Sequence, residues 1–150
     1  MKIGRVLTFL ATVLLAGTAA ALRHCEQLLK EGAHLLDIGG ESTRPGSPAV
    51  PLDEELARVL PVLREACRLG VPISVDTYKA EVMQAALDVG VDIVNDIWAL
   101  RRSPALAVVA AHPRCGVCLM HMHRDPQTMQ VAPMEGDVLP DVIDFLRDRA

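Results

Sequence analysis

The residues best suited to chemistry are polar side chains that stand at the ends of short apolar runs. Four runs end in this way, and the polar residues are Asp37, Asp76 with Thr77, Asn95 with Asp96, and His121. A carboxylate only accepts hydrogen bonds, whereas the amide of Asn95 donates and accepts, so the set suits a heterocycle edge with both kinds of group. Alternatively, Asp76 or Thr77 could cap a helix that begins near Lys79, and Asn95 and Asp96 could bond to loop backbone. Their recurrence at successive run ends favours a ligand site.

A loop rich in small and hydroxyl residues follows the first of these runs. Its sequence is Gly-Gly-Glu-Ser-Thr-Arg-Pro-Gly over residues 39–46. The glycines free the backbone, the hydroxyls of Ser42 and Thr43 can donate hydrogen bonds, and the guanidinium of Arg44 can bind two oxygens of one anion. We therefore expect a phosphate or diphosphate site, although an ordinary polar loop can have the same composition.

The sequence contains four cysteines, Cys25, Cys67, Cys115 and Cys118. Three of them lie in predicted buried helix or strand, so they indicate a reduced, cytoplasmic protein rather than a disulfide framework. Together with His121 and His123, the last two cysteines invite a redox or zinc site. We expect neither, and assign no metal ligand. A reactive cysteine pair usually begins a helix, whereas this one leads into a strand on which Cys118 points away from the other three side chains.

The elements that must position these residues alternate between helix and strand. Amphipathic periodicity, with glycines that can end a helix, predicts helices over residues 18–31, 53–68, 79–89, 104–111 and 137–149. Short apolar runs predict strands over residues 34–38, 73–77, 92–97 and 117–122. Acidic residues 53–55 favour the start of the second helix, and Ser103 is expected to cap the fourth.

This alternation predicts an α/β fold with a parallel sheet, because strand–helix–strand units connect parallel strands. The first strand is not followed by the glycine-rich fingerprint of a dinucleotide-binding fold. In a TIM barrel the carboxyl ends of all strands meet at one mouth, which would gather the polar residues described above. We therefore predict parallel (β/α) units of a TIM barrel, roughly half to five-eighths of the full barrel.

Composition and charge limit the remaining classes of function. Hydrophobic residues make up 51% of the chain and aromatic residues only 3%, which suits helix-on-strand packing. A net charge of −4 with scattered Lys and Arg gives no electrostatic footprint for nucleic acid. Residues 1–18 form an atypical apolar segment with a basic start, typical of a signal peptide or of a first strand running into a helix. The apolar stretch is short for a membrane span, so we expect a cytoplasmic protein without a membrane partner, with export as the alternative.

Four segments, in order and in register, resemble the dihydropteroate synthase family. The most characteristic is Leu-Asp-Ile-Gly-Gly-Glu-Ser-Thr-Arg-Pro-Gly over residues 36–46. Ile-Ser-Val-Asp-Thr over 73–77 and Ile-Val-Asn-Asp-Ile over 93–97 follow it. The fourth is Leu-Met-His-Met over 119–122 with Pro-Gln-Thr-Met-Gln over 126–130. The resemblance runs from about residue 19 to residue 150, and these residues are expected to form a partial pterin-binding barrel domain.

The resemblance implies a TIM-barrel transferase of folate biosynthesis that joins a hydroxymethyl-dihydropterin diphosphate to p-aminobenzoate and releases diphosphate. It implies that Thr43 and Arg44, with Ser42, contact the diphosphate and frame the aminobenzoate site. By the same resemblance Asp76 accepts a hydrogen bond from a pterin N–H group, and Asn95 binds the aminopyrimidine edge. Thr43, Arg44 and Asp76 are then the catalytic candidates. Of the remaining substrate-binding candidates, Asp37 supports the mouth, and Met120 or Met122 packs near the pterin ring.

The sequence also departs from the family pattern. The family's first loop carries an Asn that serves a magnesium–diphosphate, whereas residues 6–17 contain no Asn and no carboxylate. The family's Asp-Pro-Gly-Phe-Gly segment, its pterin-binding Lys and its Arg-x-His pair have no counterpart in these 150 residues. Mg²⁺ is thus expected from the resemblance alone. We expect little or no activity from the chain by itself, and self-association or a homo-oligomer through open sheet edges. The alternative is a non-catalytic pterin-binding or interaction protein.

Overall fold

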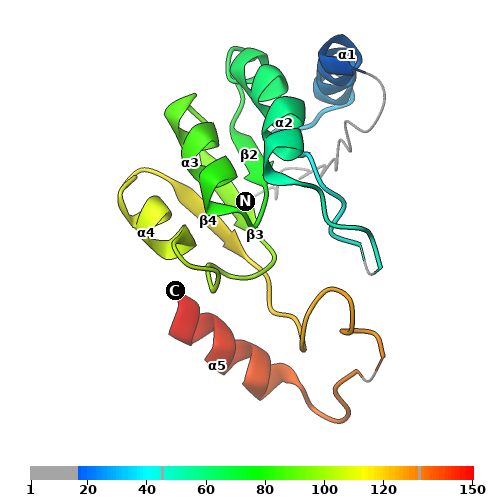
Figure 1. Ribbon diagram of the computed structural model, residues 1–150, viewed down its shortest axis with the longest axis vertical. Helices are drawn as coiled ribbons and strands as arrows, with labels where there is room; N and C mark the ends of the chain where they lie inside the picture. The colour runs from blue at the N-terminus through cyan, green and yellow to red at the C-terminus, as the bar shows by residue number, and fades with distance from the viewer. Residues whose placement is uncertain (1–16, 45, 132) are drawn as a thin grey trace.

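The computed structural model describes residues 17–44, 46–131 and 133–150 (Figure 1). Its helices are α1 (Gly17–Lys30), α2 (Leu52–Ala66), α3 (Ala80–Asp88), α4 (Ala105–Ala110) and α5 (Leu139–Arg149). Its strands are β1 (Leu36–Gly39), β2 (Ile73–Asp76), β3 (Ile93–Asp96) and β4 (Gly116–Leu119). All four strands are parallel and lie in chain order, so each helix between two strands is a crossover to the neighbouring strand.

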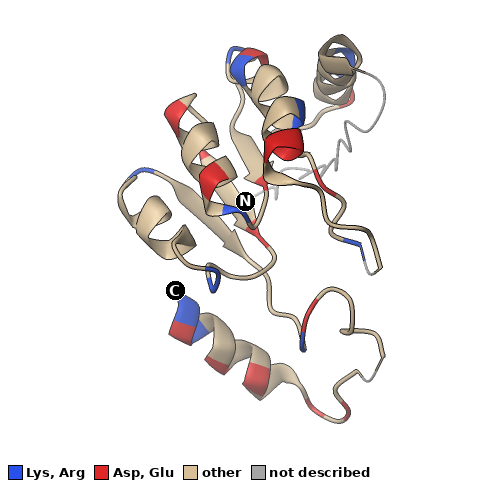
Figure 2. Ribbon diagram, viewed as in Figure 1, with Lys and Arg blue, Asp and Glu red and all other residues tan. Residues whose placement is uncertain are grey.

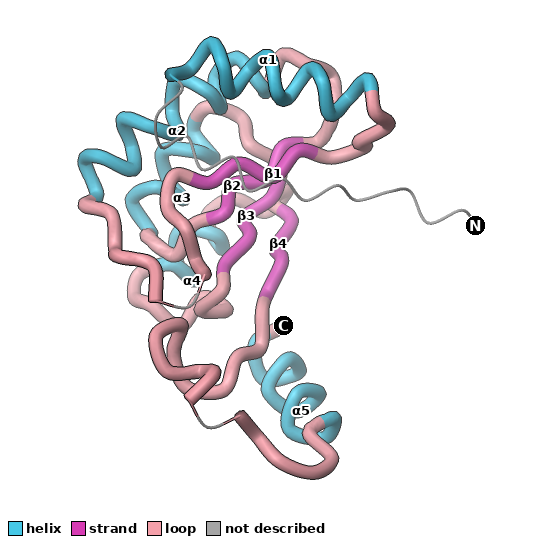
Figure 3. Tube along the Cα trace, turned by 90° about the vertical axis from the view of Figure 1, so that its right-hand side faces the viewer, coloured by secondary structure: helices cyan, strands magenta, loops and turns pink. Residues whose placement is uncertain are grey.

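Helices α1 to α4 form a layer along one side of the sheet (Figure 3). Each helix packs against the next, α1 on α2, α2 on α3 and α3 on α4. The core lies between this layer and the sheet, because both contribute aliphatic side chains that are almost fully buried. Its largest members are Leu36, Ile38, Val59, Val62, Leu63, Ile73, Val75, Val82, Met83 and Val94.

The register aligns four residues, one from each strand, in a row across the sheet. Gly39 pairs with Asp76, Asp76 with Asn95, and Asn95 with Cys118. Because side chains alternate along a strand, this row lies on the sheet face opposite the core residues of β1, β2 and β3. The strands differ in burial, since every residue of β1 and β2 is buried, whereas Gly116, Val117 and Cys118 of β4 are exposed.

Helix α5 lies apart from the other helices, beyond the end of β4, at the bottom of Figure 1. None of its residues is buried. It contacts the rest of the protein through Phe145, whose ring lies edge-on to His121 at 5.1 Å between centroids. It also does so through Arg149, whose Nε donates to the carbonyl oxygen of Ala99 at 2.8 Å.

Every predicted helix and strand is present, and the differences concern their ends. Ser103 does not cap α4, because the helix begins at Ala105 and the Ala105 amide bonds to the carbonyl of Arg102 at 2.8 Å. Strand β4 ends at Leu119, the last partner of β3, so His121 belongs to the following loop and not to the strand. Helix α2 continues through Pro61.

The predicted N-terminal segment, residues 1–18, lies outside the described residues except for its last two, which begin α1. Among the helices that are described, none is long and apolar enough to cross a membrane.

Candidate functional site

The floor of the candidate site consists of Asp37, Asp76 and Asn95 on one face of the sheet. Asp76 and Asn95 lie at or next to the carboxyl ends of β2 and β3, whereas Asp37 lies two residues before the end of β1, opposite Ser74. The amide Nδ2 of Asn95 donates to Oδ2 of Asp37 at 2.9 Å. Asp37 is 4% exposed and Asp76 is 6% exposed. Among the described residues, no donor reaches the buried Oδ1 atom of either carboxylate. A buried acceptor without a partner is unfavourable, so this floor is built to receive donors from elsewhere.

The carboxyl group of Asp76 has a strongly perturbed pKa. Burial raises this pKa from 3.8 to about 7, and the negative charges of Asp37, Glu55, Asp96 and Glu41 add to the effect. The raised pKa favours the protonated form, whereas a ligand N–H donor would favour the ionised form. Perturbed titratable groups of this kind cluster at functional sites.

Gly39 leaves the space that the Asp76 side chain occupies. A Cβ atom on Gly39 would lie 3.1 Å from the backbone oxygen of Asp76 and 3.2 Å from its Cβ. These distances are shorter than ordinary van der Waals contact, so a larger residue at position 39 would displace Asp76.

Asn95 and Asp96 are neighbours in sequence but have different roles. Asp96 is fully buried on the opposite face, and its two oxygens accept the amides of Trp98 and Leu100, both at 2.8 Å. It thereby shapes the loop after β3, in which Ala99 and Leu100 have positive φ angles of 50° and 57°. Asp96 therefore bonds to the backbone of its loop, as the alternative interpretation of the Asn95–Asp96 pair predicted. The Asn95 side chain instead bonds to Asp37 and faces the site.

The loop after β1 holds Ser42, Thr43 and Arg44 in a compact turn. The hydroxyl of Ser47 donates to the hydroxyl of Ser42 at 2.9 Å, and the Ser47 amide bonds to the carbonyl of Arg44 at 3.1 Å. Gly46 lies between Arg44 and Ser47 in sequence and has a φ angle of +77°, a conformation that glycine adopts without strain. Arg44 is exposed and makes no ion pair with a described side chain, so its guanidinium is free to bind an anion.

Thr43 and Arg44 line a cavity of about 380 Å³ at the rim of the sheet. Arg102 also lines this cavity, and its guanidinium lies 4.4 Å from the ring centroid of Trp98 and 4.6 Å from that of Tyr78. Such stacking holds the cation in place. The floor carboxylates do not line this cavity, so the cavity lies beside the Asp37–Asp76–Asn95 floor and not over it.

The predicted residues Met120 and Met122 lie in a different place. Met122 is 7% exposed, and both methionines line a cavity of about 350 Å³ together with Val138 and Val142. This cavity lies between the loop after β4 and the start of α5. A role for either methionine beside a pterin ring stays a prediction.

The four cysteines are unpaired thiols in the structure. Burial raises the pKa of each, which disfavours the reactive thiolate, and for Cys118 the charges of Asp37 and Asp76 contribute as well. That influence agrees with the position of Cys118 in the same row as Asp76 and Asn95.

A buried ion-pair cluster connects three segments next to the site, and sequence reasoning missed it. The ammonium of Lys79 bonds to the carboxylates of both Glu41 and Glu55. The hydroxyl of Tyr78 donates to Glu41 at 2.8 Å, and the hydroxyl of Thr77 donates to Glu55 at 2.7 Å. Glu55 was expected only to favour the start of α2, whereas it is 1% exposed. The sequence offered one signal of this burial: Glu55, the third acidic residue of the first turn, lies on the apolar face of the predicted helix.

In the part of the chain that the structure describes, no three His, Cys, Asp or Glu side chains converge closely enough to hold a metal ion. Mg²⁺ stays a prediction from the family resemblance.

The sequence and the fold both match proteins of known identity. The family pattern described as pterin binding enzyme matches residues 8–150. The chain is 50% identical over 131 residues to the dihydropteroate synthase of Neisseria meningitidis serogroup B, which covers 87% of this chain and 46% of that protein. It is 44% identical over 128 residues to the dihydropteroate synthase of Bacillus subtilis, covering 85% and 44%.

A solved structure of a dihydropteroate synthase also matches this chain. The crystal structure of Burkholderia cenocepacia dihydropteroate synthase complexed with 7,8-dihydropteroate matches with a TM-score of 0.85 and 52% identity, covering 97% of this chain and 52% of that one. The chain spans about half the length of the curated relatives it matches. These matches confirm the predicted family and fold class: the chain belongs to the pterin-binding enzyme family, and its parallel β/α units are part of a TIM barrel.

Proposed function

We propose that the protein containing this chain is a dihydropteroate synthase, and that the chain supplies the floor of its pterin pocket. The observation that carries the proposal is the pair of buried carboxylates, Asp37 and Asp76, whose Oδ1 atoms lack a donor from any described residue. The names of the relatives support the reaction, since they are dihydropteroate synthases at 44% to 50% identity.

The chemistry of the floor fits the edge of a pterin. A pterin's aminopyrimidinone edge presents N–H donors beside carbonyl and ring-nitrogen acceptors, and a carboxylate beside an amide complements such an edge. Asp76 would accept from a ring N–H group. Asp37 already holds one N–H of Asn95, which fixes the amide orientation and leaves the Asn95 carbonyl oxygen and second N–H for the ligand.

The reaction requires the pterin CH2–O bond to break, with its electron pair leaving on the diphosphate. The amine nitrogen of p-aminobenzoate then forms the new C–N bond and loses a proton. Negative charge grows on the leaving diphosphate, so donors and cations placed there lower the barrier. Arg44, exposed and without a described ion-pair partner, and the hydroxyls of Ser42 and Thr43 are the groups of this chain that would bind it. Magnesium would supply further positive charge at the diphosphate.

A pterin titration tests the proposal. The wild-type protein should bind a 6-substituted pterin, and Asp76→Ala and Asn95→Ala should each weaken binding by about 10- to 100-fold, the usual loss for one charge-assisted or bidentate contact. Asp88→Ala is the matched control, because the Asp88 side chain is 61% exposed on α3. No binding by the wild type, or equal binding by all variants, would refute the pterin site.

A product assay separates the enzyme from the second candidate, a pterin-binding protein without catalysis. The full-length protein that contains this chain is incubated with a hydroxymethyl-dihydropterin diphosphate and labelled p-aminobenzoate. Formation of labelled dihydropteroate supports the synthase. Pterin binding without product would leave the binding protein as the better description.

A further inference from the structure

Lys79 joins two elements that flank the proposed site. Its ammonium bonds to Glu41, in the loop after β1, and to Glu55, in the first turn of α2, which is red in Figure 2. All three side chains are shielded from solvent, with exposed fractions of 16% for Lys79, 8% for Glu41 and 1% for Glu55. Shielding makes these interactions stronger than a surface ion pair and makes the loss of one partner more damaging.

The two carboxylates are not equally fixed. Glu55 is held by α2, whose next turn places Val59 in the core, and by the Thr77 hydroxyl. Glu41 belongs to a loop, and its other described partner is the hydroxyl of Tyr78. Glu41 is also the last buried residue before Ser42, Thr43 and Arg44, which are only partly buried or exposed. The Lys79–Glu41 bond is therefore the last fixed point before the residues proposed to bind diphosphate.

The preceding residue reaches the same helix. The carbonyl of Gly40 accepts a bond from Arg58 at 2.8 Å. A Cβ on Gly40 would lie 2.7 Å from Val59 and 2.9 Å from the Glu55 side chain, so the backbone packs directly on α2. The entry of the loop is thus set by packing at Gly40 and by charge at Glu41.

We infer that Lys79 is a positioning residue, which binds Glu41 and Glu55 together and thereby fixes the loop that carries Ser42, Thr43 and Arg44 beside the site. Without its ammonium, two shielded carboxylates would face each other with only hydroxyl donors between them. Their repulsion would displace Glu41, because Glu55 is anchored by α2. The inference rests on the proposed function only for the identity of the ligand.

Lys79 also balances charge near the floor. The negative charges of Asp37 of β1, Glu55 of α2, Asp96 of β3 and Glu41 of the loop all raise the pKa of Asp76, and the charge of Asp76 in turn raises the pKa of the Cys118 thiol of β4. Removing the ammonium that neutralises Glu41 and Glu55 should raise the pKa of Asp76 further. The pH at which pterin binding is half maximal should then move upward, an effect that a loss of packing alone would not produce.

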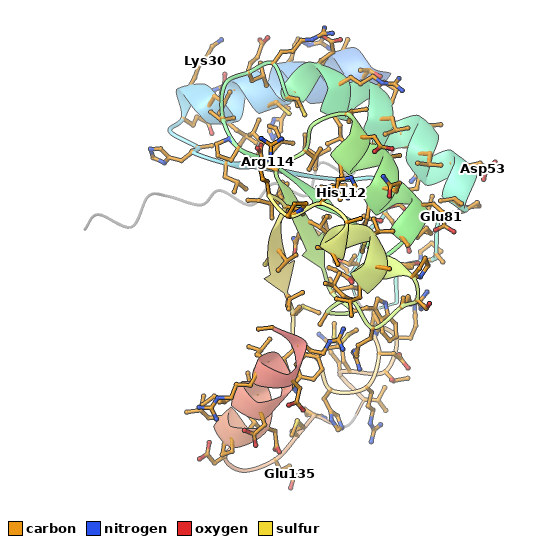
Figure 4. All side chains as sticks on the ribbon, turned by 90° about the vertical axis from the view of Figure 1, so that its left-hand side faces the viewer. Lys30, Asp53, Glu81, His112, Arg114 and Glu135 are labelled. Carbon is orange, nitrogen blue, oxygen red and sulfur yellow. The ribbon has the colours of Figure 1, made fainter. Side chains whose placement is uncertain are left out.

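The test compares Lys79→Met with Lys79→Arg, which keeps the charge and can reach both carboxylates, and with Lys30→Met. Lys30 is an exposed residue at the outer end of α1 (Figure 4). Amide hydrogen exchange over residues 40–51 is measured by mass spectrometry, without any ligand. Lys79→Met should accelerate exchange there by about tenfold or more, corresponding to about 1.4 kcal/mol of local stability. Exchange in β2 should stay as in the wild type, and Lys79→Arg should restore most of the protection.

Binding measurements complete the test. In Lys79→Met the affinity for inorganic diphosphate should fall about fivefold or more, while pterin binding persists with its pH midpoint shifted upward. Unchanged exchange over residues 40–51, or equal acceleration throughout the sheet, would overturn the inference. If Lys79→Met does not fold, Glu41→Gln keeps the Lys79–Glu55 pair and should give the same loop-specific change in smaller size. A wild type that binds no pterin would refute the proposed function, whereas the exchange result judges Lys79 independently.

Discussion

Replacing Asp76 with asparagine should stabilise the folded protein at alkaline pH, although it removes a group proposed to bind the ligand. The carboxyl of Asp76 is buried among other carboxylates, and ionising it there is unfavourable. Asparagine has nearly the same shape and cannot ionise. The variant therefore avoids this penalty at every pH, whereas the wild type avoids it only while Asp76 is protonated.

The size of the effect follows from the pKa. Burial and neighbouring charges raise the pKa of Asp76 from 3.8 to about 7. Between these values the unfolded carboxyl has lost its proton and the folded one has kept it, so the free energy of unfolding falls as the pH rises. A shift of about three pH units at about 1.4 kcal/mol each gives an upper limit of about 4 kcal/mol. Residual structure in the unfolded chain reduces this value, and we expect about 2–4 kcal/mol.

Urea denaturation from about pH 4 to pH 8 measures this quantity as the difference between the variant and the wild type. Taking the difference removes the contribution of titrating groups that do not interact with Asp76, and a constant effect of the new amide only offsets the difference without changing its dependence on pH. The difference should grow between about pH 4 and 7 and stay level above that range. For Asp88→Asn, at an exposed position on α3, it should stay within about 0.5 kcal/mol. A difference for Asp76→Asn that is the same at both ends of the range would refute the reasoning.

Three further substitutions test the packing, the loop and the sheet edge. Gly40→Ala should destabilise the protein by about 1–3 kcal/mol and lower its Tm, because the new Cβ would lie 2.7 Å from Val59. Asp96→Ala should destabilise it by about 2–4 kcal/mol, since two backbone amides lose their acceptor, and the fluorescence of Trp98 should shift to longer wavelength. Val117→Lys should reduce self-association in sedimentation velocity, because Val117 is 46% exposed on β4 and a lysine there blocks strand pairing.

For each of these three substitutions, one result would contradict the expectation. A Gly40→Ala variant as stable as the wild type would mean that α2 can move away from the loop without loss. An unchanged emission spectrum in Asp96→Ala would show that the loop after β3 keeps its shape without the carboxylate. If Val117→Lys associates as the wild type does, or if neither associates, the β4 edge is not a contact surface.

The sequence predicts the elements well because each has a local cause. Helices alternate with short apolar strands, and glycines at positions 32, 70 and 90 adopt the positive φ angles that end helices. The floor is predictable for the same reason in part, since parallel strands bring Asp76 and Asn95 to one edge of the sheet. Asp37 lies two residues before the end of β1, and it joins them because its side chain points to the same face. The end of β4 is less predictable, because it is set by the last partner on β3 and not by the apolar run itself.

The assignment of roles within the floor depends on which face a side chain takes. Asn95 and Asp96 are neighbours and both polar, and only the family resemblance singled out Asn95 as a ligand-binding residue. Alternation along β3 puts Asn95 in the row with Asp76 and places Asp96 against the helix layer. A buried carboxylate on the helix side needs donors from its own loop, and the amides of Trp98 and Leu100 supply them.

The Lys79 cluster could not be predicted, because it joins residues that are 24 and 38 positions apart in sequence. Glu55 lies in the acidic first turn of α2, where a carboxylate is favoured by the helix dipole without any partner. Only the fold shows that this carboxylate is buried and therefore requires Lys79. The same cluster contributes two of the charges that raise the pKa of Asp76. Lys79 thus connects the loop after β1 to α2 through tertiary contacts that no local sequence pattern contains.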